Sequence, residues 1–283
     1  NKMWELAGPP IAFEIMENSP VRAVVRIKRV FNQSTITQDI VMYSNSRRID
    51  FHTVVDWNER EKMLKVAFFP DVLSTKATYE IQFGSIERPT HWNTSYDKSK
   101  FEVCGHKWAD LSEGGYGVSL LNDCKYGYDI KDNSMRLTLL RSPVMPDPYG
   151  DIGTHEFVYS LFPHEGDWRT GKTVHKGYEL NVPLTAVFVK DQNTGNLPTS
   201  FFWVDRDNVV LDTVKKAQNS DGIIVRMYES CGMRGKVTLG WNTKEQAVFE
   251  CNLMEDNEAQ LFPSDKTISF EIKPYEIKTF RLK

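Results

Sequence analysis

The sequence predicts an all-β protein, with a large antiparallel β-sandwich followed by a small immunoglobulin-like sandwich. Three observations lead to this prediction. Polar and apolar side chains alternate with a period of two, as in residues 48–57, where Asp50, His52 and Asp56 face away from an apolar side. Helical periodicity is nearly confined to residues 171–180. Strands and helices do not alternate, which argues against a parallel sheet because parallel strands need long, usually helical crossovers.

The expected elements follow from this period and from the turn residues that bound it. In the first sandwich, residues 1–200, we expect a short helix at 171–180 and strands at 21–31, 34–43, 48–57, 63–69, 78–83, 116–121, 136–140, 157–162 and 184–190. A polar, turn-rich segment at 191–198 places the domain boundary near residue 200. The second sandwich, residues 201–283, should contain strands at 208–213, 222–228, 236–241, 247–252, 267–272 and 277–282.

Composition restricts the classes of function. The 283 residues are 40% hydrophobic and 26% charged, which is typical of a globular chain. Thirty-five basic against 38 acidic residues give a net charge of −3, without the basic excess of most nucleic-acid or membrane-surface binders. No apolar run approaches the ~20 residues of a membrane span. The four cysteines, Cys104, Cys124, Cys231 and Cys251, are few for this length, so we expect free thiols and a cytoplasmic protein.

Metal and catalytic motifs are weakly represented. The densest His and Cys group, formed by His91, Cys104, His106 and Cys124, matches no zinc spacing. Motifs for a nucleophilic serine or for nucleotide phosphates do not occur. Carboxylates stand in turn-like contexts at Asp110, Glu113, Asp123 and Asp151, but no pair can be assigned to glycoside cleavage because sequence does not measure the separation of two carboxylates.

The densest mixture of polar and aromatic residues lies at 108–129. Asn122, Asp123, Lys125 and Tyr126 cluster where a predicted strand ends, between glycines that permit tight turns. Amide and carboxylate groups of this kind bind sugar hydroxyls, while an aromatic face covers the apolar side of a sugar ring. A well-satisfied turn between two strands explains the same residues. Both interpretations remain open at this point.

The same region carries a resemblance to a known family. Several ordered segments, taken together, resemble the C-terminal region of glycoside hydrolase family 38 α-mannosidases, in their bacterial and cytosolic subgroup. The segments are 49–57, 64–68, 87–91 (Glu-Arg-Pro-Thr-His), 107–113 (Lys-Trp-Ala-Asp-Leu-Ser-Glu), 120–128 (Leu-Leu-Asn-Asp-Cys-Lys-Tyr-Gly-Tyr), 139–143, 146–155, 225–229 and 274–277. They span almost the whole chain.

The resemblance implies a retaining, exo-acting α-mannosidase whose first β domain is a supersandwich like that of galactose mutarotases. In the family a metal-dependent α/β barrel and a helical domain precede the β domains, and they supply the nucleophile and the ligands of a divalent metal such as zinc. We therefore expect no catalytic residue, metal ligand or cofactor in this chain. Its expected partners are those domains of the same polypeptide and an α-mannoside. The residues expected to contact substrate are Asn122, Asp123, Lys125 and Tyr126, with Glu113 and Arg88 as further candidates.

Two other functions are compatible with the sequence. An independent carbohydrate-binding module would need exposed, coplanar rings on one concave face, for which Trp92, Trp168 and Trp203 are the candidates. A purely structural or interaction role would need no contact with sugar.

Overall fold

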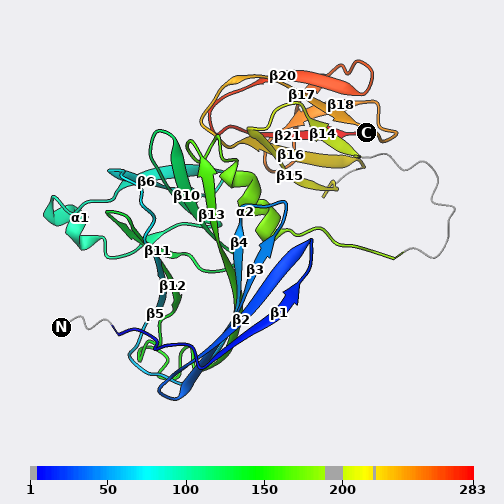
Figure 1. Ribbon diagram of the computed structural model, residues 1–283. Coiled ribbons are helices and arrows are strands. Elements are labelled where there is room, and N and C mark those ends of the chain that lie inside the picture. Colours follow the sequence, from blue (N-terminus) through cyan, green and yellow to red (C-terminus); the bar gives the residue numbers. More distant parts are fainter. Residues whose placement is uncertain (1–4, 189–199, 219–220) are drawn as a thin grey trace. The chain divides into compact units, whose positions relative to one another are not determined.

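The computed structural model describes residues 5–188, 200–218 and 221–283, and these form two compact units. The first unit runs to Leu184 without residues 82–85, and the second comprises Gln82–Ser85 and the chain from Thr185 onward. The predicted turn-rich segment 191–198 lies outside the described residues. Strands dominate both units (Figure 1), which confirms the all-β prediction.

The first unit is built on one large sheet. Its nine strands follow the order β1-β2-β3-β4-β13-β10-β9-β6-β7. Their bounds are β1 Ala12–Asn18, β2 Arg22–Phe31, β3 Ser34–Tyr43, β4 Ile49–Trp57, β6 Lys76–Ile81, β7 Gly84–Pro89, β9 Trp108–Ser112, β10 Tyr116–Asn122 and β13 Gly153–Glu165. The registers are antiparallel, as predicted, and the long central strand β13 pairs with β4 on one side and β10 on the other.

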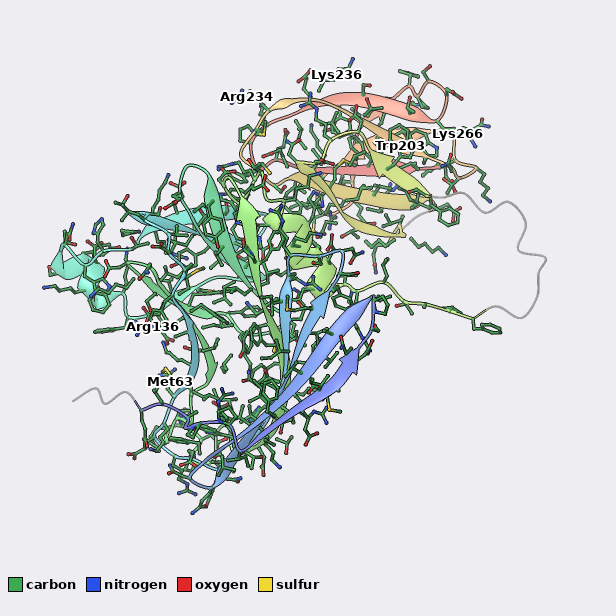
Figure 2. All side chains as sticks on the ribbon, viewed as in Figure 1. Met63, Arg136, Trp203, Arg234, Lys236 and Lys266 are labelled. Carbon is green, nitrogen blue, oxygen red and sulfur yellow. The ribbon has the colours of Figure 1, made fainter. Side chains whose placement is uncertain are left out.

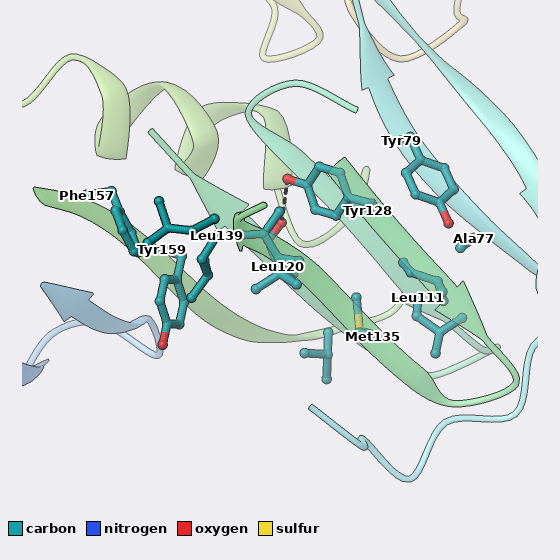
Figure 3. Packing of buried hydrophobic residues seen from close by; sticks show 14 of the residues in the cluster. Ala77, Tyr79, Leu111, Leu120, Tyr128, Met135, Leu139, Phe157 and Tyr159 are labelled. Atoms are coloured by element: carbon teal, nitrogen blue, oxygen red, sulfur yellow. Dashed lines mark hydrogen bonds between the residues drawn. The ribbon is translucent and has the colours of Figure 1, made fainter. Parts of the chain in front are cut away.

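A smaller sheet packs against one face of the large one. Its order is β5-β12-β11-β8, with β5 Leu64–Phe68, β8 Val103–Cys104, β11 Gly127–Lys131 and β12 Ser134–Leu140. Because side chains alternate across a strand, Tyr128 and Ile130 of β11 and Met135 and Leu137 of β12 point to the large sheet, where they join a buried core. Figure 3 shows Tyr128 in this core, with its hydroxyl bonded to the Leu120 carbonyl.

The opposite face of the large sheet is covered by α2 (Thr173–Asn181), close to the predicted helix. A buried polar cluster joins them. The Asp110 carboxylate accepts hydrogen bonds from Ser119 Oγ at 2.8 Å and from His164 Nε2 at 2.7 Å, and Ser119 Oγ lies 2.7 Å from Thr173 Oγ1 of the helix. Gly117 leaves room for the imidazole, because a Cβ there would come within 2.4 Å of it. A second, short helix, α1, spans Ser95–Ser99.

The second unit is a small sandwich, as predicted. One sheet has the order β14-β17-β20 and the other β15-β16-β21-β18-β19. The bounds are β14 Phe202–Val204, β15 Val209–Lys216, β16 Ile223–Glu229, β17 Gly235–Trp241, β18 Val248–Cys251, β19 Asn257–Leu261, β20 Thr267–Ile272 and β21 Ile277–Leu282. Both sheets contribute to its core, for example Leu239 and Trp241 from one and Met227 and Phe280 from the other.

One predicted strand is wrong over the residues that can be assessed. Residues 184–188 form no strand, and 189–190 lie outside the described residues. Leu184, Val187 and Phe188 are all strongly exposed, so the alternating pattern finds neither a neighbouring strand nor a core to bury its apolar side. Among the described residues, no helix is long and apolar enough to cross a membrane.

Candidate functional site

The turn between β10 and β11 holds four of the six predicted substrate-binding residues. Its first residue, Asn122, is fully buried. The Asn122 amide nitrogen donates to the His106 carbonyl at 2.8 Å and to the Tyr128 hydroxyl, and its side-chain oxygen accepts from the Lys125 backbone N–H at 2.6 Å. Asn181 of α2 donates to the Asn122 carbonyl at 2.9 Å. Asn122 therefore shapes the turn from within and has no surface to offer a sugar.

Asp123 follows at the edge of the turn and is half-buried. Its Oδ2 accepts from the Val158 N–H at 3.0 Å, and its own N–H donates to the Val158 carbonyl at 3.1 Å. Its Oδ1 is buried without a hydrogen-bond partner. Buried polar atoms are nearly always paired in native proteins, so this oxygen is the clearest acceptor at the turn for a group from outside it.

The tip of the turn is exposed and carries the polar and aromatic groups expected from the sequence. Tyr126 is 50% exposed and stacks on His106, with the ring centroids 5.3 Å apart. The Lys125 ammonium lies 4.5 Å from the centroid of the Phe157 ring. His106 and Phe157 were not predicted as site residues, because only their positions across the turn and on β13 bring them here.

A neighbouring carboxylate, Asp151, belongs to the loop before β13. Burial raises the pKa of its carboxyl, but hydrogen bonds from the Arg141 and Ser142 N–H groups, followed by the electrostatic effects of His155 and Lys125, outweigh this and leave the pKa below its usual range. The charge of Lys125 thus links the tip of the turn to this loop.

Arg88 lies apart from the turn. It lines a cavity of about 30 Å³ to which none of the turn residues contributes. Its guanidinium lies 4.6 Å from the Tyr79 ring centroid, and its Nη1 is buried without a hydrogen-bond partner. Burial lowers the pKa of Arg88, while Tyr79 and Cys104 partly oppose this. The structure does not bring Arg88 together with Asp123 or Tyr126 in one cavity.

Glu113 is also separate. It is exposed, and its Oε2 accepts from the Leu73 N–H at 2.8 Å. It lines a different hollow, of about 130 Å³, with Asp110, Asp167 and Arg169 among the other lining residues. The predicted six residues therefore divide into a turn and two distant positions, and only Asp123, Lys125 and Tyr126 offer surface at the turn.

The three candidate tryptophans do not form one stacking face. Trp168 is only 3% exposed, because it packs on Trp108 with the ring centroids 5.1 Å apart and Arg169 covers it at 4.2 Å. Trp203 belongs to β14 of the second unit. Trp92 remains partly exposed in the first unit. The three tryptophans therefore do not form the coplanar face that an independent carbohydrate-binding module would need.

Metal and thiol chemistry can be checked directly. Across residues 5–188, 200–218 and 221–283, no three His, Cys, Asp or Glu side chains gather so that they could hold a metal ion. The residues present therefore do not fit a metal centre. All four cysteines are in the reduced form: Cys104 and Cys124 are exposed, Cys231 is half-buried and Cys251 is buried.

Comparison with known proteins settles the family. Residues 2–149 match the glycosyl hydrolases family 38 C-terminal domain, and residues 208–280 match the family 38 C-terminal beta sandwich domain. The chain belongs to glycoside hydrolase family 38. Within this family it corresponds to C-terminal domains, as the sequence resemblance predicted, and the two matched segments fall in the two predicted sandwiches.

Several of its relatives are α-mannosidases. The chain is 40% identical over 95% of its length to alpha-mannosidase G of Dictyostelium discoideum, 39% over 88% to human alpha-mannosidase 2C1, and 33% over 98% to the alpha-mannosidase of Saccharomyces cerevisiae. It spans 26%, 24% and 27% of these proteins, about a quarter of each. A crystal structure of an alpha-mannosidase from Enterococcus faecalis shares the fold, with a TM-score of 0.81 at 17% identity over 96% of this chain and 35% of that one.

Proposed function

We propose that this chain is the C-terminal β region of a retaining exo-α-mannosidase that hydrolyses terminal α-mannosides, and that it supports and completes an active site in a metal-dependent barrel of the same polypeptide. Its family and its α-mannosidase relatives support the substrate class. The single observation that carries the assignment of a site is the unpartnered Oδ1 of Asp123 beside the exposed ring of Tyr126.

The turn would act by positioning. A sugar hydroxyl would donate to Asp123 Oδ1 when a shift of the turn uncovers this buried oxygen, while Tyr126 would bond the sugar through its hydroxyl and cover the apolar side of the ring with its open face. Asn122 holds the turn in place from below, so binding would order few groups that are not already ordered. We assign the nucleophile and the divalent metal to the barrel, so no bond-breaking step involves the residues described here.

The proposed partner domains need a surface on which to pack. The face of the large sheet that carries the core continues past the small sheet onto β1–β3, where Phe13, Ile15 and Met42 are more than half exposed. Exposed apolar patches of this kind mark protein interfaces. Because the chain spans only about a quarter of its relatives, we assign this face to the remaining domains of the same polypeptide.

The proposal is tested in the full-length protein. Asp123→Asn keeps the acceptor for Val158 but removes the charge at Oδ1, and Tyr126→Phe removes the hydroxyl. Each change should lower kcat/KM for an aryl α-mannoside at least about tenfold, or about 1.4 kcal/mol, if the interaction strengthens in the transition state. The melting temperature should hardly change, since Asn has the shape of Asp and keeps the acceptor for Val158, and since substitutions at exposed positions such as Tyr126 usually alter stability by about 0.5 kcal/mol or less.

Two controls make this test specific. Tyr116→Phe changes a similarly exposed tyrosine at the other end of β10 and should leave kcat/KM unchanged. The chain without the proposed barrel should hydrolyse no α-mannoside. Full activity in both turn variants would show that the turn is structural only.

We also infer a cytoplasmic protein, because the four thiols are free. Thiol titration of the purified, denatured chain without reductant should count four groups. A count near two or zero would reveal disulfides and contradict this location.

A further inference from the structure

A third hollow of the first unit lies at the tip of the β11–β12 hairpin. Its volume is about 400 Å³, and none of its lining residues belongs to the turn after β10. The hairpin tip is held on both sides: Asn133 Nδ2 donates to the Pro70 carbonyl at 3.0 Å, and the Asp132 N–H donates to the Thr90 carbonyl at 2.8 Å. Phe69 directly precedes Pro70 and Trp92 follows Thr90 by two residues, and both line the hollow.

Aromatic and polar side chains both line the hollow, which we call the groove. Phe69 is 70% exposed. The Lys131 ammonium is held 4.1 Å from the Trp92 ring centroid, which keeps this donor at the groove. The hairpin residues Asp132, Asn133 and Ser134 also line the groove. An apolar ring face beside carboxylate, amide, hydroxyl and ammonium groups is the combination that a sugar ring requires.

The charges around the groove are balanced. Arg136, which lines it and is labelled in Figure 2, forms an ion pair of 2.6 Å with Asp129. Asp132 offsets the charge of Lys131. A strongly anionic ligand such as a phosphate chain would find no excess of positive charge here, whereas a neutral polyol would not need one.

Trp92 also borders the small cavity that holds Arg88. Two nitrogen atoms there, Arg88 Nη1 and His91 Nδ1, are buried without hydrogen-bond partners. The cavity volume of about 30 Å³ suits water or a single hydroxyl group, not a whole sugar ring. The unpaired buried nitrogens in this cavity and the aromatic and polar lining of the neighbouring groove both point to a hydroxyl-rich ligand at this tryptophan.

We propose that the groove between Phe69 and Trp92 binds a neutral hexopyranose unit of a glycan. The choice of a sugar rests on the proposed function, since the family acts on glycosides. The groove would hold part of a branched or extended mannoside and so raise its local concentration near the enzyme. Binding to one such unit should be weak, in the millimolar range, because few groups enclose it.

The test titrates the chain with α-mannobiose and follows the backbone amides by NMR. We expect saturable shifts at residues 131–136, with Phe69→Ala weakening the affinity at least about fivefold, as the loss of one aromatic contact predicts. Phe262→Ala is the matched control, because Phe262 is 85% exposed in the second unit and should leave the affinity unchanged. Trp92→Ala should weaken binding like Phe69→Ala, while Trp203→Ala should not.

Three results would overturn this inference. They are the absence of saturable shifts, equal losses in Phe69→Ala and Phe262→Ala, and binding that survives Phe69→Ala but is lost in Asp123→Asn. The last result would place the sugar at the turn and support the proposed function while excluding the groove. Because binding is measured on the chain without hydrolysis, failure here leaves the test in the full-length enzyme unaffected. If the groove binds no sugar and other domains of the full-length protein protect it, the groove is an internal interface.

Discussion

Asn122 and Asp123 are neighbours in sequence, but their side chains differ in burial and in hydrogen bonding. Asn122 is fully buried and bonded through both its amide nitrogen and its oxygen, whereas Asp123 is half-buried and leaves one carboxylate oxygen without a partner. The first residue fixes the turn, and the second presents a group that the fold itself does not use. The polar motif was predicted from the sequence as one site. Its first residue stabilises the turn, and the next residue is the one available for binding.

The largest effect on stability should come from replacing Asn122, the residue that fixes the turn. Asn122→Ala leaves the Lys125 N–H without its acceptor, and it removes one hydrogen bond each from the His106 carbonyl and the Tyr128 hydroxyl, which stay bonded to each other. Leaving a buried polar group unpaired costs about 1–3 kcal/mol, so we expect a loss of about 3 kcal/mol in the free energy of unfolding. Urea unfolding of the chain, followed by circular dichroism, measures it.

Asp123→Asn is the matched control for this comparison. It keeps an acceptor for Val158 and should change the free energy of unfolding by about 0.5 kcal/mol or less. Similar losses in both variants would erase the distinction between the two residues.

The contrast also shows what the sequence can predict. Strands with a clear period of two, such as β3 and β4, appear where expected, because one buried face leaves an alternating pattern. β9 was not predicted, since four of its five residues are buried and the pattern has no polar side to reveal the period. Conversely, alternation at 184–188 predicted a strand that the fold does not form.

The site shows a similar limit. The polar composition of residues 122–126 indicated a special turn, but the burial of Asn122 depends on the His106 carbonyl, which lies in another loop. Arg88 and Glu113 were grouped with the turn although they line separate hollows, because sequence order carries no distances. The same reason hid His106 and Phe157, which contact Tyr126 and Lys125 only in the folded chain.

A smaller effect concerns Asp151 and tests whether the charge at the tip of the turn influences the carboxyl group of the neighbouring loop. The pKa of Asp151 is lowered in the folded chain, so its carboxylate stabilises the fold at a pH above its unfolded pKa of about 3.9, and this contribution is lost as the pH falls through the lower folded value. Asp151→Asn should therefore cost about 1 kcal/mol or less at pH 7, with the difference disappearing in acid. Unfolding at several pH values measures it.

The contribution of the tip is isolated by Lys125→Met. Because the Lys125 charge helps to lower the pKa of Asp151, its loss should raise that pKa, as followed by NMR titration of the carboxyl. A stability difference for Asp151→Asn that does not vary with pH, or an unchanged titration in Lys125→Met, would show that the loop and the tip are electrostatically independent.

The smallest effect tests Asp123 itself through its neighbour. Burial, followed by a hydrogen bond to the Asp123 carboxylate and by its negative charge, raises the pKa of the Cys124 thiol to about 11, although Cys124 is exposed. Only the thiolate reacts, so Cys124 should be alkylated slowly by iodoacetamide at pH 8, and each unit of lowered pKa should speed the reaction about tenfold. Asp123→Asn removes the negative charge and should therefore accelerate alkylation several-fold and move the midpoint of the pH–rate curve down, while the exposed Cys104 reacts as before. Peptide mass spectrometry resolves the two thiols. An unchanged rate and midpoint at Cys124 would mean that another group already compensates the charge of Asp123 in solution. In that case the unpartnered oxygen of Asp123 would not be the acceptor for a sugar hydroxyl.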